Sequence, residues 1–315
     1  MKKRVYGVIG IVSKMANWNA DFTGYPKTTS DGDTFGSDKA LKYPMKKMWE
    51  SQGEKILYIK SMKLSEKNGE TSLVPRSLKE RYEYLYNVED LKKCKDTKVV
   101  LTNLFNSLDV KNCGATFAES GNNISITGAV QIGQGFNKYE GTNPEEQQIL
   151  SPFRDSSKDN KNEDSEEAKN STLGTKIVSN EAHYFYPFTI NPMAYNEYKN
   201  LEVTDGYMED DYAKFKEAAL LSATYFATNA KVGCENEFAL FVETESDLYL
   251  PNLSEFIKFD KGEEKNTIEI QCSSLLNSLK DRIINIEIYY NPYTTIIKSE
   301  IEGAKKLDIF TQKEV

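Results

Sequence analysis

The alternation of hydrophobic and polar positions along the chain predicts several strands. Residues 4–13 are apolar at almost every position, as in a central strand that is covered on both faces. Residues 123–134 alternate apolar and polar side chains, so we expect one strand with a single buried face. Further strands are predicted at 238–244 and 283–290, and an extended segment at 183–192.

The spacing of apolar residues also predicts two helices. The first begins after Ser37, whose hydroxyl can cap it, and ends near Gln52, before Gly53. Its apolar face carries Ala40, Leu41, Met45, Met48 and Trp49, and its opposite face carries Lys39, Lys42 and Lys46. Pro44 leaves open whether this helix kinks or begins there. The second helix covers residues 209–228, and the acidic residues at its start suit the helix dipole.

Two stretches lack a clear period. Residues 54–112 mix lysine, tyrosine and short apolar runs and are interpreted as an irregular inserted lobe. Residues 154–171 contain no large apolar side chain and are predicted to be a flexible excursion. With both removed, the order of strands and helices predicts an α+β fold, compatible with the ferredoxin-like split βαβ arrangement on which the RNA-recognition motif is built.

Composition narrows the class of protein. The 315 residues can bury a full core, as one elaborated domain or two. A net charge of −8 argues only weakly against RNA, because binding depends on where the positive charge lies. With only five arginines, the basic charge is nearly all lysine, which favours contacts to phosphate over forked readout of bases.

The sequence lacks the residues that membrane insertion, zinc binding and several common kinds of catalysis require. No apolar run approaches the roughly 18 residues of a membrane span, and the N-terminal segment is interpreted as a strand and not as a signal peptide. The four scattered cysteines and the single histidine offer no zinc pattern, and reduced thiols in a cytosol are expected. No nucleophile elbow, zinc-protease or P-loop motif occurs. We expect His183 to be a packed structural histidine and Asp109 to be a cap or an ion-pair partner.

Three groups of segments together resemble a known family. The first is the opening strand, followed by Asn17, Asn19 and the run SDKALKYPMK. The second is FNSLDVKNCGATF followed by ITGAVQIGQG, and the third is STLGTK, HYFYPF and a helix that leads into ATNAK. In this order they resemble the backbone subunit of type I-B Cascade, the CRISPR RNA-guided surveillance complex, in the RAMP superfamily. The resemblance covers nearly the whole chain.

The resemblance implies a modified RNA-recognition-motif palm with an inserted finger or web lobe and a thumb hairpin. The palm would comprise residues 1–53, 113–136 and 191–315, the lobe residues 54–112, and the thumb residues 137–190. Copies of the chain would stack along a guide RNA (crRNA), contact other Cascade subunits and hold the duplex of that RNA with the target DNA strand. No catalytic residue, cofactor, metal or membrane partner is implied, and the expected location is cytoplasmic.

The resemblance also implies a set of side chains that face RNA. They are Lys14, Asn17, Asn19, Ser37, Lys39, Lys42, Lys46, Gln131, Gln134, Lys138, Ser171, Thr172, Lys176 and Lys231. Trp18 is either a stacking residue or part of the core. Two alternatives stay open: a metal-dependent RNase of the related type III backbone class, using one of Asp21, Asp31, Asp33 and Asp38, and the subunit that caps the 5′ end of the guide.

Overall fold

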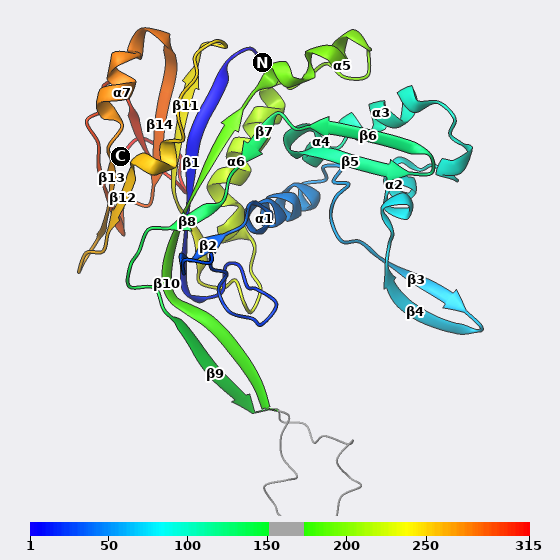
Figure 1. The fold of residues 1–315 in the computed structure, drawn as a ribbon, viewed down its shortest axis with the longest axis horizontal. Helices are drawn as coiled ribbons and strands as arrows, with labels where there is room; N and C mark the ends of the chain where they lie inside the picture. Colours follow the sequence, from blue (N-terminus) through cyan, green and yellow to red (C-terminus); the bar gives the residue numbers. More distant parts are fainter. Residues whose placement is uncertain (151–172) are drawn as a thin grey trace, which may run out of the picture.

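The computed structural model describes residues 1–150 and 173–315, which form a mixed α+β structure (Figure 1). Its main sheet is nine-stranded within these residues. In order across the sheet the strands are β16 (Lys305–Asp308), β14 (Ile283–Tyr290), β11 (Cys234–Thr244), β1 (Arg4–Ala16), β10 (Leu173–Ile190), β8 (Gly135–Asn137) and β2 (Phe35–Gly36). Strands β7 (Val130–Ile132) and β9 (Pro144–Leu150) also pair with β10.

Strand β1 is the buried centre of this sheet, as its apolar sequence predicts. It pairs antiparallel with β10 on one side and with β11 on the other. Val5, Ile9 and Ile11 belong to the core on one face of the sheet, whereas Tyr6 and Val8 belong to a second core on the opposite face. Because both faces are covered, a polar side chain in the middle of β1 would find no water on either side.

The first face is covered by the two predicted helices, α1 (Asp38–Ser51) and α6 (Glu209–Tyr225) (Figure 1). Ser37 caps α1, since its Oγ accepts a hydrogen bond from the backbone N–H of Ala40 at 3.3 Å. The helix begins at Asp38 and runs through Pro44, which is buried against the core. The proline therefore neither starts nor ends the helix.

The opposite face is covered by a small mixed sheet and short helices. They are β12 (Ile257–Asp260), β13 (Asn266–Ile270), β15 (Thr295–Lys298), α7 (Ser273–Ser278) and the 3₁₀ helices η5 (Leu253–Phe256) and η6 (Lys280–Arg282). Ile257, Ile268 and Ile297, one from each strand of this sheet, pack with β1, β11 and β14. The central sheet thus lies between two apolar layers, which is the arrangement that a strand buried on both faces requires.

The lobe between α1 and β7 is more regular than the sequence suggested. It contains β3 (Met62–Lys67), β4 (Glu70–Pro75), α2 (Leu78–Tyr86), η1 (Leu91–Lys93), α3 (Thr97–Phe105), α4 (Leu108–Cys113), β5 (Gly114–Glu119) and β6 (Asn122–Thr127). Its helices are too short to show a clear apolar period, so the residues that cap them are the better indication of where they begin. Ser77 and Glu80 form a capping box at α2, and Asp96 caps α3.

The prediction of one strand over residues 123–134 is wrong. The segment forms β6, which pairs with β5 in the lobe, and β7, which pairs with β10 in the main sheet. The chain changes sheets at Gly128, where a Cβ atom would lie 2.3 Å from the carbonyl carbon of Cys113. Each of these two strands buries one face, so their apolar and polar residues together formed one continuous alternation in the sequence. Ala129, between the two strands, is buried although that pattern placed it on the polar face.

The remaining predicted elements agree with the structure. The extended segment at 183–192 falls mostly in β10, and the strands at 238–244 and 283–290 are β11 and β14. Between α6 and β10 lie η4 (Pro192–Tyr195) and α5 (Asn196–Asn200). The polar stretch 154–171 lies outside the described residues. No helix in the described part of the chain is long and apolar enough to cross a bilayer.

Substitution of Gly7 tests the packing around β1. A Cβ atom at Gly7 would lie 2.1 Å from the Leu240 carbonyl oxygen and 2.5 Å from the Phe188 ring, so Gly7→Ala forces β1 away from β11. We expect the free energy of unfolding to fall by about 2 kcal/mol or more in urea denaturation. Gly174→Ala is the control, because its nearest neighbour would be 3.8 Å away. A change within about 0.5 kcal/mol is expected there, and equal stability of the two variants would contradict the packing argument.

Candidate nucleic-acid interface

Several of the predicted RNA-facing residues meet where β1 ends. Asn17 donates from Nδ2 to the carbonyl oxygens of Gly24, at 2.8 Å, and of Ile177, at 3.2 Å. Its backbone N–H donates to the carbonyl oxygen of Ala230 at 2.9 Å. One buried asparagine therefore ties the end of β1 to the following loop, to the hairpin strand β10 and to the segment after α6.

Trp18 belongs to the core and not to the surface. Its side chain is 1% exposed, and its Nε1–H donates to the Tyr186 hydroxyl at 2.5 Å. Lys231 covers it, with Nζ 5.3 Å from the ring centroid and donating to the carbonyl oxygens of Trp18 and, at 2.7 Å, of Asn17. Burial lowers the pKa of the Lys231 ammonium. The base-stacking alternative for Trp18 is therefore wrong in this conformation, and Lys231 acts first as an internal clamp.

Asn19, Ser37 and Lys39 lie together at the start of α1. The Asn19 side-chain oxygen accepts a hydrogen bond from the Ser37 backbone N–H at 2.7 Å, which holds the loop against the helix. Lys39, two residues later, is exposed. Gln134 is exposed too and directly precedes Gly135, which pairs with Gly36 in β2. Polar side chains from α1 and from the glycine-rich segment thus share one edge of the sheet.

The three lysines on the polar face of α1 differ in their surroundings. Lys42 pairs with Asp38 one turn earlier, with Nζ and Oδ2 2.8 Å apart. Lys46 lies 3.3 Å from the fully buried carboxylate of Asp109 and donates to the Tyr58 carbonyl oxygen at 3.2 Å. Lys39 alone of the three has no ion pair with a described residue. The uniform solvated stripe suggested by the helical wheel is therefore not what the structure has.

Asp109 is the ion-pair partner that the sequence analysis expected it to be. Its two carboxylate oxygens accept hydrogen bonds from the backbone N–H groups of Leu57 and Tyr58, both at 2.9 Å. Asp109 lies on α4, near the end of the lobe, whereas Leu57 and Tyr58 lie at its beginning. Together with Lys46 on α1, this carboxylate fixes both ends of the lobe to the helix.

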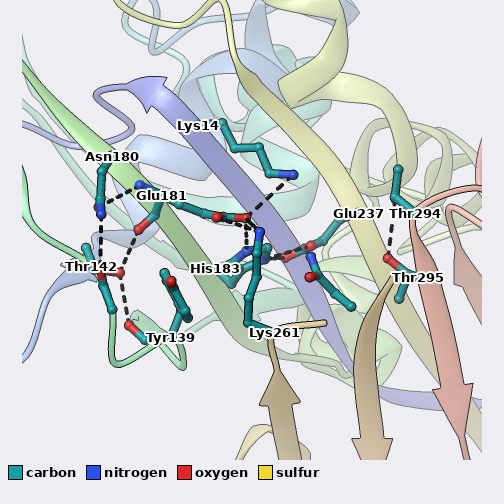
Figure 2. Close-up of polar contacts among 12 residues, drawn as sticks. Lys14, Tyr139, Thr142, Asn180, Glu181, His183, Glu237, Lys261, Thr294 and Thr295 are labelled. Atoms are coloured by element: carbon teal, nitrogen blue, oxygen red, sulfur yellow. Dashed lines mark hydrogen bonds and ion pairs between the residues drawn. The ribbon is translucent and has the colours of Figure 1, made fainter. Parts of the chain in front are cut away.

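Lys14 lies on the opposite face of the sheet, in a polar cluster around His183 (Figure 2). Its Nζ is 3.5 Å from Glu181, which also binds Lys261 at 2.7 Å. His183 is fully buried between two carboxylates, with Nδ1 2.8 Å from Glu237 and Nε2 3.1 Å from Glu181. Each of the two imidazole nitrogens therefore has a carboxylate as its neighbour.

The His183 cluster joins the small sheet to the main sheet. The imidazole stacks on Phe259 of β12 with ring centroids 3.8 Å apart. Burial acts to raise the pKa of Glu181, but the hydrogen bonds from Lys261 and His183 outweigh it and hold that pKa below its usual value. The expectation of a packed structural histidine is confirmed. A small cavity of about 170 Å³ beside it is lined by Lys14, Glu235 and Asn291, among others.

Other predicted residues are more scattered. Gln131 pairs with Thr189, twelve residues beyond Ile177 on β10, which is about 40 Å along an extended strand. Its amide donates to the Gly128 carbonyl oxygen at 2.8 Å. Lys138 and Lys176 are half-buried near the base of the β9–β10 hairpin. Ser171 and Thr172 lie outside the described residues. Gln131 thus lies far along β10 from the contact that Asn17 makes with Ile177.

Two of the four aspartates considered for metal chemistry have other partners. Asp21 accepts hydrogen bonds from the backbone N–H and hydroxyl of Thr23, at 2.8 and 2.7 Å, and these lower its pKa although burial opposes them. Asp38 pairs with Lys42. Asp31 and Asp33 are exposed. Within residues 1–150 and 173–315, no three His, Cys, Asp or Glu side chains are placed to hold a metal ion.

Two residues of the loop that follows β1 make contacts that were not predicted from the sequence. The Tyr25 hydroxyl donates to Glu146 of β9, and Lys27 lies with Nζ 5.9 Å from the Phe35 ring centroid. The first contact joins residues 121 positions apart, which a local pattern could not reveal. The second lies within the stretch YPKTTSDGDTF, whose lysine and aromatic residues were visible in the sequence.

Comparisons with known proteins match the chain to one protein family. A model of the family described as CRISPR-associated protein Cas7 matches residues 3–279, from β1 to the end of α7. A solved structure titled "CRISPR RNA-guided surveillance complex, pre-nicking" contains a similar chain, with 14% sequence identity, a TM-score of 0.49 and 96% of each chain covered. No curated protein matches the sequence.

Removal of the Asp109 carboxylate tests its role at the base of the lobe. Asp109→Ala leaves two backbone N–H groups without an acceptor and Lys46 without its partner, so we expect a loss of about 3–5 kcal/mol in the free energy of unfolding. Lys42→Ala removes a more exposed pair and should cost about 1 kcal/mol or less. Urea denaturation compares the two, and a similar small loss for both would remove Asp109 from this role.

Glu181→Gln tests the cluster in Figure 2 through pH. The folded-state pKa of Glu181 lies below its value of 4.5 in the unfolded chain, so its stabilising effect is present above pH 4.5 and is lost as the pH falls through the folded pKa. The difference in unfolding free energy between wild type and variant should therefore shrink from about pH 6 to about pH 3. Glu300→Gln, at an exposed glutamate, is the control. A difference that stays constant with pH would argue against the ion-paired carboxylate.

Proposed function

The chain belongs to the CRISPR-associated Cas7 family, and from this we propose that it is a non-catalytic subunit that binds crRNA and forms the backbone of a CRISPR surveillance complex. The single observation that supports this best is the convergence at the end of β1. Hydrogen bonds within the protein hold Asn17, Asn19 and Ser37 in the loop that follows β1 and at the start of α1. Exposed Lys39 and Gln134 extend from the same edge.

The topology supports an RNA-recognition-motif palm as part of the proposal. Strands β11, β1, β10 and β7 are neighbours in this order and antiparallel, and α1 and α6 pack on one face. This order, with α1 following β1 and α6 preceding β11, supports the proposed split βαβ arrangement. The lobe from β3 to β6 would then be the finger or web, and the base of the β9–β10 hairpin the start of the thumb (Figure 1).

The proposal extends to partners as well. Copies of the chain would follow one another along the guide RNA in the cytosol, next to other subunits of a type I-B complex. The complex would hold the target DNA strand after it pairs with the guide, so base pairing and not the protein would select the sequence. A lysine-rich, arginine-poor chain suits such contacts, because phosphate contacts carry no sequence information.

The nuclease alternative differs in what it requires of the loop after β1. A metal-dependent RNase would need a carboxylate placed for in-line attack. Asp21 and Asp38 already bind groups of the protein, which leaves Asp31 and Asp33. The alternative therefore predicts that Asp31→Asn with Asp33→Asn abolishes a metal-dependent cut in a paired target RNA. Our proposal predicts no such cut in the wild type.

Native mass spectrometry of the chain, co-expressed with its neighbouring subunits and guide RNA, tests the proposed assembly. We expect several copies per RNA, with the number rising as the guide is lengthened. One copy at every guide length would instead indicate the subunit that caps the 5′ end. Absence of RNA from the purified particle would contradict the proposal.

Charge reversal at Lys39 tests whether the start of α1 contacts RNA. Lys39 is exposed and without an ion pair among the described residues, so Lys39→Glu should weaken RNA binding about threefold or more and lower the slope of log K against log salt by about 0.7 per copy. Lys298→Glu, on the exposed side of β15, makes the same charge change far from α1 and is the control. Fluorescence anisotropy over a salt series measures both. Identical slopes for the two variants would exclude Lys39 from the contact.

A further inference from the structure

One row of residues, aromatic except for a central glycine, crosses the main sheet from its edge strand β2 through β1 to β14. Residues directly opposite each other in antiparallel strands point to the same face, and the pairing registers connect six positions in this way. The row consists of Phe35, Phe136, Phe185, Gly10, Phe238 and Tyr290. It lies on the face opposite α1 and α6, since Phe185, Phe238 and Tyr290 belong to the core beneath the small sheet.

Gly10 is what allows the buried part of the row to close. Phe185 and Phe238 flank it on β10 and β11, and their ring centroids are 6.0 Å apart in an edge-to-face arrangement. A Cβ atom at Gly10 would lie 2.8 Å from the Cβ of Phe238 and 3.3 Å from the Phe185 ring. The missing side chain thus lets two rings meet across the central strand.

The same row leaves the core at the edge of the sheet. Phe136 is 41% exposed and Phe35 is half-buried, with ring centroids 6.0 Å apart and planes inclined by 37°. We call these two residues the aromatic ledge. The Lys27 ammonium lies 5.9 Å from the Phe35 centroid, and Gln134, two residues before Phe136, is exposed. The ledge therefore combines an aromatic surface with a cation and an amide.

The ledge is held in place from behind. Gly36 and Gly135 pair with each other next to the two phenylalanines, and their free sides face Tyr186 and Trp18. A Cβ atom would lie 1.8 Å from the Tyr186 hydroxyl at Gly36, and 2.4 Å from the Tyr186 ring at Gly135. Strands β2 and β8 are therefore pressed onto a buried aromatic pair, which fixes the direction of the rings on the other side.

We propose that the aromatic ledge is a stacking platform for an unpaired base of the bound RNA. The inference rests on the proposed function and adds the residues that contact a base. A preformed aromatic face can stack on any base, because every base has a π-face. The ledge adjoins the edge that carries Gln134, Ser37 and Lys39. The surface area of two rings is far smaller than the roughly 800 Å² that each partner buries in an ordinary protein interface. The Lys27 ammonium beside Phe35 also favours a phosphate group nearby.

The experiment compares two substitutions at Phe136 in the full-length protein. Phe136→Leu keeps an apolar side chain but removes the π-face, whereas Phe136→Tyr keeps the ring. We expect Phe136→Leu to weaken binding of a labelled oligouridine about fivefold or more, and Phe136→Tyr to change it less than about twofold. Tyr293→Leu is the control, because Tyr293 is 75% exposed on another part of the molecule. Thermal unfolding of each variant checks that the fold is intact.

A direct contact is measured by photo-crosslinking. Oligouridine with 5-iodouridine crosslinks to aromatic side chains that stack on it, and mass spectrometry should place the adduct on the peptide that contains Phe136 or Phe35. Phe136→Leu should lower the yield. If Phe136→Leu binds and crosslinks as the wild type does, the proposal is wrong.

Two further results separate the possible failures. If the wild type binds no RNA, alone or in its complex, the proposed function itself fails. If the wild type binds RNA but Phe136→Leu only weakens self-association in sedimentation without RNA, the ledge is a contact between copies and the stacking proposal is overturned. Weaker RNA binding with unchanged self-association supports it.

Discussion

The structure depends on burying β1 on both faces while it pairs on both edges. Val5, Ile9 and Ile11 contribute to one core, and Tyr6 and Val8 to the other. At about 1.5–3 kcal/mol per fully buried large aliphatic or aromatic side chain, this strand contributes to the stability of both layers at once. The arrangement works only because Gly7 leaves room for the Leu240 carbonyl and the Phe188 ring. The position of the loop after β1, and hence of Asn17 and Trp18, follows from where this strand is fixed.

Much of this organisation could be predicted from the sequence, because it is local. The apolar run gave β1, and Ser37 with the apolar spacing gave the bounds of α1, whereas the sequence leaves its passage through Pro44 open. What failed were features that depend on distant contacts. The alternation at 123–134 does not reveal that Gly128 passes against residues 112–114 and moves the chain to another sheet. Three lysines in helical spacing do not reveal that Lys46 meets Asp109, sixty-three residues later. The family resemblance survives these errors because it rests on the order of segments and not on their pairing.

The acidic net charge of −8 does not by itself exclude binding of a polyanion, because binding depends on where the unpaired positive charge lies. Asp109, Glu181 and Asp211 each bind a lysine. Such pairs contribute little field at a distance, so the sign of the surface is set locally by the residues left over. Lys39 is one of these, whereas Lys46 and Lys231 hold the scaffold together. Counting lysines along a helix therefore overestimates the number that can reach a phosphate.

The row of rings across the sheet shows how core packing can create a binding surface. An exposed ring at the edge of a sheet is normally mobile. Phe136, however, pairs in register with buried Phe185, and its strand is held by the close packing of Gly36 and Gly135 against Tyr186. Ordering such a ring costs little entropy on binding, because the fold has already restricted it. The same reasoning applies to Asn19 and Ser37, whose hydrogen bond is formed within the protein. If copies of the chain follow one another along a guide RNA, as proposed, contacts that are already in place spare an ordering cost that would otherwise recur at every copy.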